Sequence, residues 1–309
     1  MIVKLENVSK TYKNGLKALN HLNYEVREGE IYGLLGPNGS GKTTSINCLL
    51  SLLTYDEGDI YLFDEKMTPS RYDLKSQIGL VPQNVAVFNE LTVYENIDYF
   101  CSLYVKDKEE RRKCVEEAIN FVGLTDFKKF RPKKLSGGLL RRLNIACGIA
   151  HKPKLIIFDE PTVAVDPQSR NKILEGIKEL NKAGATIIYT SHYMEEIEEL
   201  CSYVVVMDKG SVIAHGTKDK LKESIGIGTT IEISLDKDID TSLFKDVSGI
   251  KDIKCIKQIL TINTLPGVSF IPEVLDILKK NNIIYGKISC EEPNLNDVFL
   301  QITGKELRD

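Results

Sequence analysis

The sequence contains no hydrophobic run long enough to cross a membrane. A spanning helix needs about 20 consecutive apolar residues. The stretches that come nearest, Leu155–Phe158 and Val204–Met207, have the length of buried strands. The first residues, MIVKLENVSK, also lack the charged start and the apolar segment of a secretory signal. We therefore expect the chain to fold in the cytoplasm.

Paired cysteines and an excess of basic residues are missing as well. The seven cysteines are scattered and none forms a CxxC pair, so we expect small buried side chains in a reducing compartment. The formal net charge is −3, whereas a nucleic-acid-binding protein usually carries a concentrated basic excess. We expect no nucleic acid among the partners.

The composition is that of a soluble α/β protein. With 309 residues, 42% of them hydrophobic and 28% charged, the chain is long enough for one large domain or two ordinary ones. Up to about residue 220, short apolar strands alternate with amphipathic helices, which is typical of a parallel sheet with crossover helices. The expected elements are strands 31–35, 155–158 and 186–190, helices 42–53 and 169–183, and a hairpin over 203–214.

Residues 90–150 contain only helical patterns. The segments Thr92–Glu95 and Asp107–Glu110 each open with an oxygen-bearing side chain and place a Glu three residues later. The first side chain can cap free backbone N–H groups while the carboxylate reaches back, which marks a helix start. We predict an all-helical insertion over residues 90–150, within a first domain that spans residues 1–222.

The pattern changes near residues 225–228. The elements expected beyond it are strand 229–235, helix 241–246, strands 252–257 and 259–264, helix 271–281, strand 283–290 and helix 294–302. The β-α-β-β-α-β order of the first six suggests a small ferredoxin-like α+β domain. We therefore predict an accessory domain over residues 228–309.

A glycine-rich loop follows the expected strand 31–35. It fits the pattern GxxxxGK[ST], and its residues are Gly36, Pro37, Asn38, Gly39, Ser40, Gly41, Lys42 and Thr43, with Thr44 next. In such a loop several backbone N–H groups converge on phosphate oxygens at the positive end of a helix dipole. Lys42 adds a positive charge, and the Thr43 hydroxyl can bind Mg²⁺. The loop predicts a nucleotide site with Mg²⁺; a plain glycine-rich turn is the alternative.

An acidic pair, Asp159-Glu160, ends the apolar strand 155–158. An acidic strand end is often only solvated, but downstream of a phosphate-binding loop it suits a Mg²⁺ site with an adjacent carboxylate. Asp159 would hold the water shell of the metal. Glu160 would orient the attacking water or accept its proton. Together the two motifs predict a P-loop nucleotide hydrolase.

The motif Leu135-Ser136-Gly137-Gly138-Leu139 resembles the LSGGQ motif of ABC ATPases and precedes Asp159 at the spacing that this family uses. Ser136, Gly137 and Gly138 would open a helix over 139–150, so that a hydroxyl and free N–H groups face an anion. The resemblance extends over most of residues 1–220. It implies a P-loop ABC ATPase domain with a RecA-like core sheet, an antiparallel β part and a helical insertion.

Four further residues match positions of known role in that family. Tyr12 stands where an aromatic ring stacks on the adenine of ATP, and Gln83 resembles the Q-loop glutamine, which contacts Mg²⁺ or water. Asp166 resembles the D-loop aspartate, and His192 resembles the switch histidine that contacts the γ-phosphate. The resemblance implies that Glu160, His192, Lys42 and Gln83 serve catalysis and that Thr43, Gln83 and Asp159 hold the metal.

Two positions depart from the family pattern. Leu139 replaces the glutamine of LSGGQ, which is a mild change, and Ala164 stands in the D-loop where glycine is usual. Because alanine disfavours positive φ, a requirement for left-handed backbone at Ala164 would shift the loop and lower turnover.

The segments Leu143–Cys147, Asp166–Asn171 and Glu292–Leu300 resemble ATPases of ABC-2-type exporters, such as bacterial drug, antibiotic and sodium-efflux systems. The resemblance implies a head-to-tail dimer with a second ATPase subunit, identical or different, in which each ATP lies between Lys42 of one subunit and Ser136 of the other. It also implies a separate polytopic membrane permease, which would hold the chain on the cytoplasmic face of the membrane. The alternative is a non-transport or regulatory soluble ABC ATPase.

Overall fold

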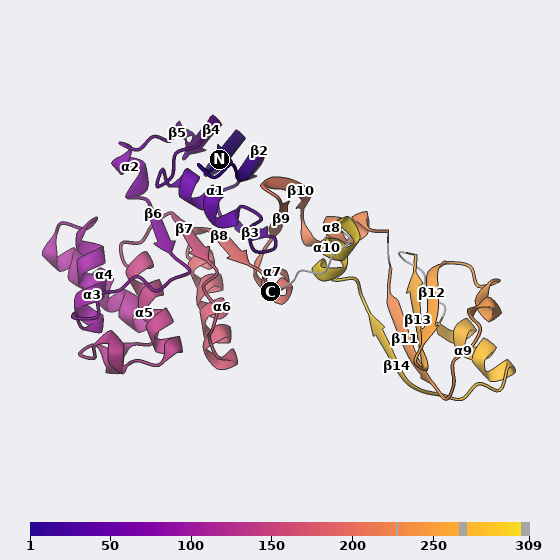
Figure 1. Ribbon diagram of the computed structural model, residues 1–309. Helices are drawn as coiled ribbons and strands as arrows, with labels where there is room; N and C mark the ends of the chain where they lie inside the picture. Colours follow the sequence, from indigo (N-terminus) through magenta and orange to yellow (C-terminus); the bar gives the residue numbers. More distant parts are fainter. Residues whose placement is uncertain (227, 266–270, 304–309) are drawn as a thin grey trace. The chain divides into compact units, whose positions relative to one another are not determined.

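The protein is described from a computed structural model that places residues 1–226, 228–265 and 271–303. Close packing divides the chain into two units, Met1–Gly216 and a second that begins at Thr217 (Figure 1). The sequence pattern puts this division between residues 222 and 228. The structure places the boundary earlier because helix α8 (Lys218–Ser224) packs against α10 (Leu295–Thr303) and so belongs to the second unit.

The first unit is built around a six-stranded sheet of order β10-β9-β3-β8-β7-β6, parallel except for β10. Its strands are β3 (Ile31–Leu35), β6 (Ile78–Val81), β7 (Leu155–Asp159), β8 (Thr186–Ser191), β9 (Tyr203–Asp208) and β10 (Ser211–Gly216). Strands β3, β7 and β8 are buried along their whole length, as a parallel sheet covered on both faces requires. The predicted strands and the hairpin are confirmed.

A second sheet of the first unit is antiparallel and has the order β2-β1-β4-β5. Its strands are β1 (Val3–Thr11), β2 (Lys17–Val26), β4 (Glu57–Leu62) and β5 (Glu65–Lys66). One hydrophobic core joins Leu5, Leu22 and Ile60 of this sheet to Leu34 of β3 and Ile46 of α1. The phosphate-binding loop, which lies between β3 and α1, is therefore anchored in a core shared by both sheets.

Four helices complete this part of the unit: α1 (Lys42–Leu49), α2 (Tyr72–Lys75), α6 (Pro167–Lys182) and α7 (Met194–Leu200). Helix α1 ends before the predicted residue 53, and Ser51 beyond it adopts a positive φ of 51°. Helix α6 begins two residues before the predicted start, because the Asp166 carboxylate accepts a hydrogen bond from the Ser169 N–H and Pro167 fits the first helical position.

The insertion over residues 90–150 is helical as predicted and gathers at one side of the unit (Figure 1). It consists of α3 (Val93–Ser102), α4 (Lys108–Phe121) and α5 (Gly137–Ile149), with 3₁₀ turns at Thr125–Phe127 and Pro132–Lys134. Thr92 and Glu95 form a full capping box at the start of α3, and Asp107 caps α4 by accepting from the Glu110 N–H.

The second unit has an antiparallel sheet of order β12-β13-β11-β14. Its elements are β11 (Thr230–Leu235), a 3₁₀ turn (Thr241–Phe244), β12 (Ile250–Ile256), β13 (Ile259–Thr264), α9 (Ile271–Lys280) and β14 (Tyr285–Glu291). The core includes Ile233, Leu260, Val274 and Leu278, so α9 packs on one face of the sheet. The ferredoxin-like order is confirmed, with a 3₁₀ turn in place of the first helix. No helix in the placed ranges combines the length and the apolar character of a membrane span.

Candidate active site

The phosphate-binding loop lies at the carboxyl end of β3, beside the ends of β8 and β7. Because β3, β8 and β7 are adjacent and parallel, the residues that follow them meet at one edge of the sheet. Gly41 caps α1 with φ of 106°, and a Cβ there would lie 2.6 Å from the Ala18 carbonyl oxygen. Only glycine fits this position, so the loop stays close to β2.

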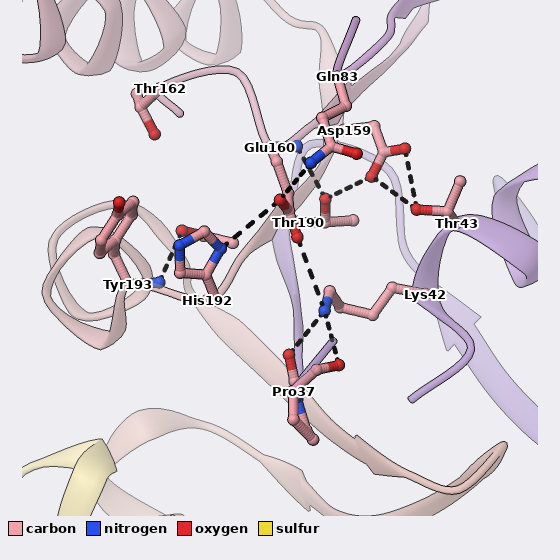
Figure 2. Close-up of polar contacts among 12 residues, drawn as sticks. Pro37, Lys42, Thr43, Gln83, Asp159, Glu160, Thr162, Thr190, His192 and Tyr193 are labelled. Carbon is pink, nitrogen blue, oxygen red and sulfur yellow. Dashed lines mark hydrogen bonds and ion pairs between the residues drawn. The ribbon is translucent and has the colours of Figure 1, made fainter. Parts of the chain in front are cut away.

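Lys42, at the start of α1, is almost fully buried. Its ammonium group donates to the Gly36 carbonyl at 2.6 Å and the Pro37 carbonyl at 3.2 Å, and it lies 3.7 Å from Glu160 Oε1 (Figure 2). Burial lowers the pKa of Lys42, and the nearby charges of Glu160 and Asp159 oppose this shift. The buried ammonium therefore lies among acidic and carbonyl oxygens at the start of the helix, where phosphate oxygens would bind well.

Asp159, at the end of β7, is held by two threonine hydroxyls. Thr43 donates to Asp159 Oδ2 at 3.1 Å, and Thr190 of β8 donates to Oδ1 at 2.8 Å. Burial raises the pKa of Asp159, and the hydrogen bonds from Thr190 and Thr43 oppose the rise. The sequence pattern pointed to Thr43 and Asp159, whereas Thr190 was missed because its role depends on the pairing of β7 with β8.

Glu160 is the point where three segments meet. The Gln83 side-chain amide donates to Glu160 Oε2 at 2.9 Å, and His192 Nδ1 lies 3.5 Å from the same oxygen (Figure 2). The Glu160 N–H donates to Thr190 Oγ1 at 3.0 Å, with the backbone of Glu160 left-handed at φ of 47°. A carboxylate that lies beside an ammonium, an amide and an imidazole is in surroundings that suit a general base, which orients a water molecule and accepts its proton.

Two residues of α5 that sequence reasoning missed fix the start of the Q-loop. Arg141 is buried and donates to the carbonyls of Pro82 at 3.0 Å and Glu160 at 3.1 Å. Asn144 donates to the Pro82 carbonyl at 3.2 Å and accepts from the Ala86 N–H at 3.0 Å. Both are polar residues in a largely apolar helix, and that contrast was the signal that the sequence offered for them.

A cavity of about 300 Å³ lies above the loop. Its lining includes these residues predicted from the sequence: Tyr12, Asn38, Gly39, Ser40, Gly41, Lys42, Thr43, Thr44, Gln83 and Glu160. Leu16, Lys17, Ala18 and Lys209 also line it and were not predicted. The volume lies at the lower end of the range for ligand pockets, roughly 300–1,000 Å³. The Tyr12 hydroxyl lies 3.2 Å from Thr44 Oγ1, so the ring borders the same cavity.

The signature and D-loop residues do not line this cavity within the chain. Ser136 caps α5 by accepting from the Leu139 N–H at 3.4 Å. Helices α5 and α6 start against each other, because a Cβ on Gly138 would lie 2.3 Å from Ser169 Oγ. Ala164 has φ of 58°, so the D-loop takes the left-handed conformation without glycine.

Comparison with known proteins gives a consistent result. The family described as ABC transporter matches residues 19–163. The chain is 36% identical to the linearmycin resistance ATP-binding protein LnrL of Bacillus subtilis, with both chains covered fully. It is 33% identical to the Nod factor export ATP-binding protein I of Cupriavidus pinatubonensis, over 100% of this chain and 92% of the relative. The dimeric structure of a bacterial ABC transporter cassette superposes with a TM-score of 0.65 at 31% identity, over 70% of this chain and 98% of that one. A structure of that cassette in a post-hydrolysis state with ADP and Pi superposes equally well.

The loop between β3 and α1 and the acidic pair after β7 define a P-loop nucleotide hydrolase. The relatives that match along the whole chain place this nucleotide hydrolase in one family. The chain belongs to the ABC transporter ATP-binding proteins, and it is the ATP-binding and ATP-hydrolysing subunit of an ABC transporter.

Proposed function

We propose that ATP binds in the cavity above the phosphate-binding loop and that Glu160 directs its hydrolysis. The main support is the meeting of Gln83, Glu160 and His192 within 3.5 Å beside the buried Lys42. The adenine would stack on Tyr12, the phosphates would accept hydrogen bonds from the loop, and Lys17 and Lys209 would add positive charge at the cavity. The unit Met1–Gly216 is then the nucleotide-binding domain, and the unit that begins at Thr217 is the accessory domain.

The chemistry assigned to each residue follows from its surroundings. Lys42 and the N–H groups of the loop stabilise charge on the phosphoryl oxygens. Glu160 orients the attacking water and accepts its proton, while the Gln83 amide donates to the Glu160 carboxylate and fixes it. His192, whose Nδ1 lies 3.5 Å from the same carboxylate, would donate to a γ-phosphate oxygen. In-line attack by water on the γ-phosphorus then yields ADP and phosphate.

The residues present fit a Mg²⁺ ion. Thr43, which lines the cavity together with Gln83, has its Oγ1 3.1 Å from Asp159 Oδ2, so a hydroxyl and a carboxylate supply hard oxygen donors side by side. In the placed ranges no group of three or more His, Cys, Asp or Glu side chains forms a metal site on its own. That agrees with Mg²⁺, which is usually held by one or two carboxylates together with substrate phosphates. When bound, the ion would neutralise charge on the β- and γ-phosphate oxygens.

Two subunits would form each complete site, head to tail. Ser136, Gly137 and Gly138 open α5 outside the cavity of their own chain, and a Cβ on Gly137 would meet no atom within 4 Å. A free helix start with a serine hydroxyl suits the γ-phosphate bound by a second subunit. The dimeric form of the similar cassette supports this arrangement.

A groove beside the Q-loop suits a membrane permease. It has a volume of about 320 Å³, lies between the sheet and the insertion, and is lined mainly by apolar residues such as Leu80, Phe100, Leu103 and Tyr104. A short amphipathic helix presented by a permease would bury such a surface. Arg141 and Asn144 of α5 bind Pro82 and Ala86, which lie on either side of Gln83, and Arg141 also donates to the Glu160 carbonyl, so movement at the groove would reach Glu160. The relatives named for linearmycin resistance and Nod factor export favour outward transport, with the chain on the cytoplasmic face of the membrane.

The test of the catalytic assignment is Glu160→Gln. The variant should bind ATP as the wild type does and lose hydrolysis, measured as phosphate release with the permease present, by about 100-fold or more. Glu28→Gln, at an exposed position outside the cavity, is the matched control and should keep full turnover. Unchanged hydrolysis by Glu160→Gln would refute the assignment.

A further inference from the structure

A carboxylate outside the proposed catalytic set is completely buried. Glu196, in α7, has an exposed fraction of 0%. Its Oε2 accepts hydrogen bonds from the hydroxyls of Tyr189 and Ser191, both at 2.7 Å, and its Oε1 pairs with Arg170 Nε at 2.7 Å. A buried carboxylate is costly unless it is paired and hydrogen-bonded, and a hydrophobic side chain would fill the same space at lower cost. Stability alone therefore does not explain why a carboxylate occupies this buried position.

The hydroxyl of Ser191 connects Glu196 to the residues on both sides of His192. It donates to Glu196 Oε2 and accepts from the Tyr193 N–H at 2.9 Å. A hydroxyl has one proton and two lone pairs, so the proton of Ser191 is committed to Glu196. Burial raises the pKa of Tyr189, which keeps its proton and donates to the same carboxylate oxygen. The backbone before and after His192 is thus tied to one buried anion.

Arg170 provides a second connection to the same place. It belongs to α6, the helix that begins at the D-loop, and its guanidinium lies over the Tyr193 ring, 5.2 Å from the centroid. The Tyr193 ring packs against the His192 ring with 4.2 Å between centroids (Figure 2). The arginine therefore holds the carboxylate from one side and the neighbour of His192 from the other.

We infer that Glu196, held by Arg170, is a positioning residue that sets the orientation of the His192 imidazole toward Glu160 and the γ-phosphate of ATP. The inference rests on the proposed role of His192. Neither Glu196 nor Arg170 lines the nucleotide cavity, so both act through the backbone and the ring at residues 191–193. The hydrolysis step proposed above stays the same. Glu196 and Arg170 affect only the position of His192, one of the hydrogen-bond donors in that step.

The test compares the positioning residues in two backgrounds. Ser191→Ala and Glu196→Gln should each lower kcat for ATP hydrolysis, by about 10-fold for Glu196→Gln, with KM nearly unchanged, because displacement of a catalytic group mainly affects the transition state. In a His192→Ala background the same changes should lower kcat no further, since groups that act as a unit are not additive. Arg170→Lys should retain more turnover than Arg170→Met.

Thermal unfolding and ATP binding of each variant separate positioning from folding. If Glu196→Gln does not fold, Ser191→Ala carries the test alone, because it removes only one hydroxyl. Losses that multiply with that of His192→Ala, or full turnover in a folded Ser191→Ala or Glu196→Gln protein, would overturn the inference while leaving the proposed function intact. Full turnover by His192→Ala would overturn both the role of His192 and the positioning that depends on it.

Discussion

Replacement of Ala164 by glycine should stabilise the protein. Ala164 has φ of 58° and its side chain is exposed, so glycine would relieve strain without losing packing. A left-handed backbone costs a residue with a Cβ roughly 1–2 kcal/mol. The extra freedom of glycine in the unfolded chain offsets about 0.4–1 kcal/mol of this. We therefore expect the free energy of unfolding to rise by roughly 0.5–1 kcal/mol.

The assay is urea and thermal unfolding of the purified protein, in which Tm should rise by about 1–4 °C. Ala183→Gly is the matched control, because Ala183 is exposed in the same part of the fold with φ of −77°. There glycine adds only unfolded-state freedom and should lower stability by about 0.4–1 kcal/mol. Equal losses in the two variants would refute the argument from left-handed strain. Turnover of Ala164→Gly should change little, because the D-loop already takes this conformation with alanine.

Three further changes test other parts of the molecule. Burial lowers the pKa of His151 from its usual 6.5, so the unfolded chain binds a proton more readily than the folded chain does. The free energy of unfolding should therefore fall as the pH drops from about 7 to 5. His151→Phe should make that fall smaller in urea titrations. Arg141→Met leaves two carbonyls without their buried donor and should cost roughly 2–4 kcal/mol in thermal unfolding and reduce turnover. Gly138→Ala should separate the starts of α5 and α6. In the Glu160→Gln background it should therefore weaken ATP-dependent dimerisation, measured by size-exclusion chromatography. Gly137→Ala is the control for stability, because a Cβ at Gly137 would contact no atom within 4 Å.

The order of elements was predictable because it depends on local patterns. The strand 31–35, the phosphate-binding loop and the strand that ends at the acidic pair follow from periodicity and from spacing that a phosphate requires. Element ends were less predictable, because they depend on single caps and turns. Asp166 starts α6 two residues early, and the segment near 241–246 forms only a 3₁₀ turn from Thr241 to Phe244.

The site was predictable for residues that carry a motif, and less so for those that act through partners distant in sequence. Lys42, Asp159, Glu160, Gln83 and His192 come together as the resemblance implied. Thr190 and Glu196 do not belong to any short motif. Their roles depend on the pairing of β8 with β7 and on the packing of α6 against α7, which link segments about 20–30 residues apart or more.

The most direct test of a transport role is recovery of the permease with the Glu160→Gln protein. The tagged protein would be purified with ATP from detergent-solubilised native membranes, alongside the same protein with Leu103→Asp in the apolar groove. We expect a polytopic membrane protein to accompany Glu160→Gln and to be lost from the groove variant, which should still bind ATP. Recovery of soluble partners alone, or of the same membrane protein in both samples, would contradict docking of a permease at this groove.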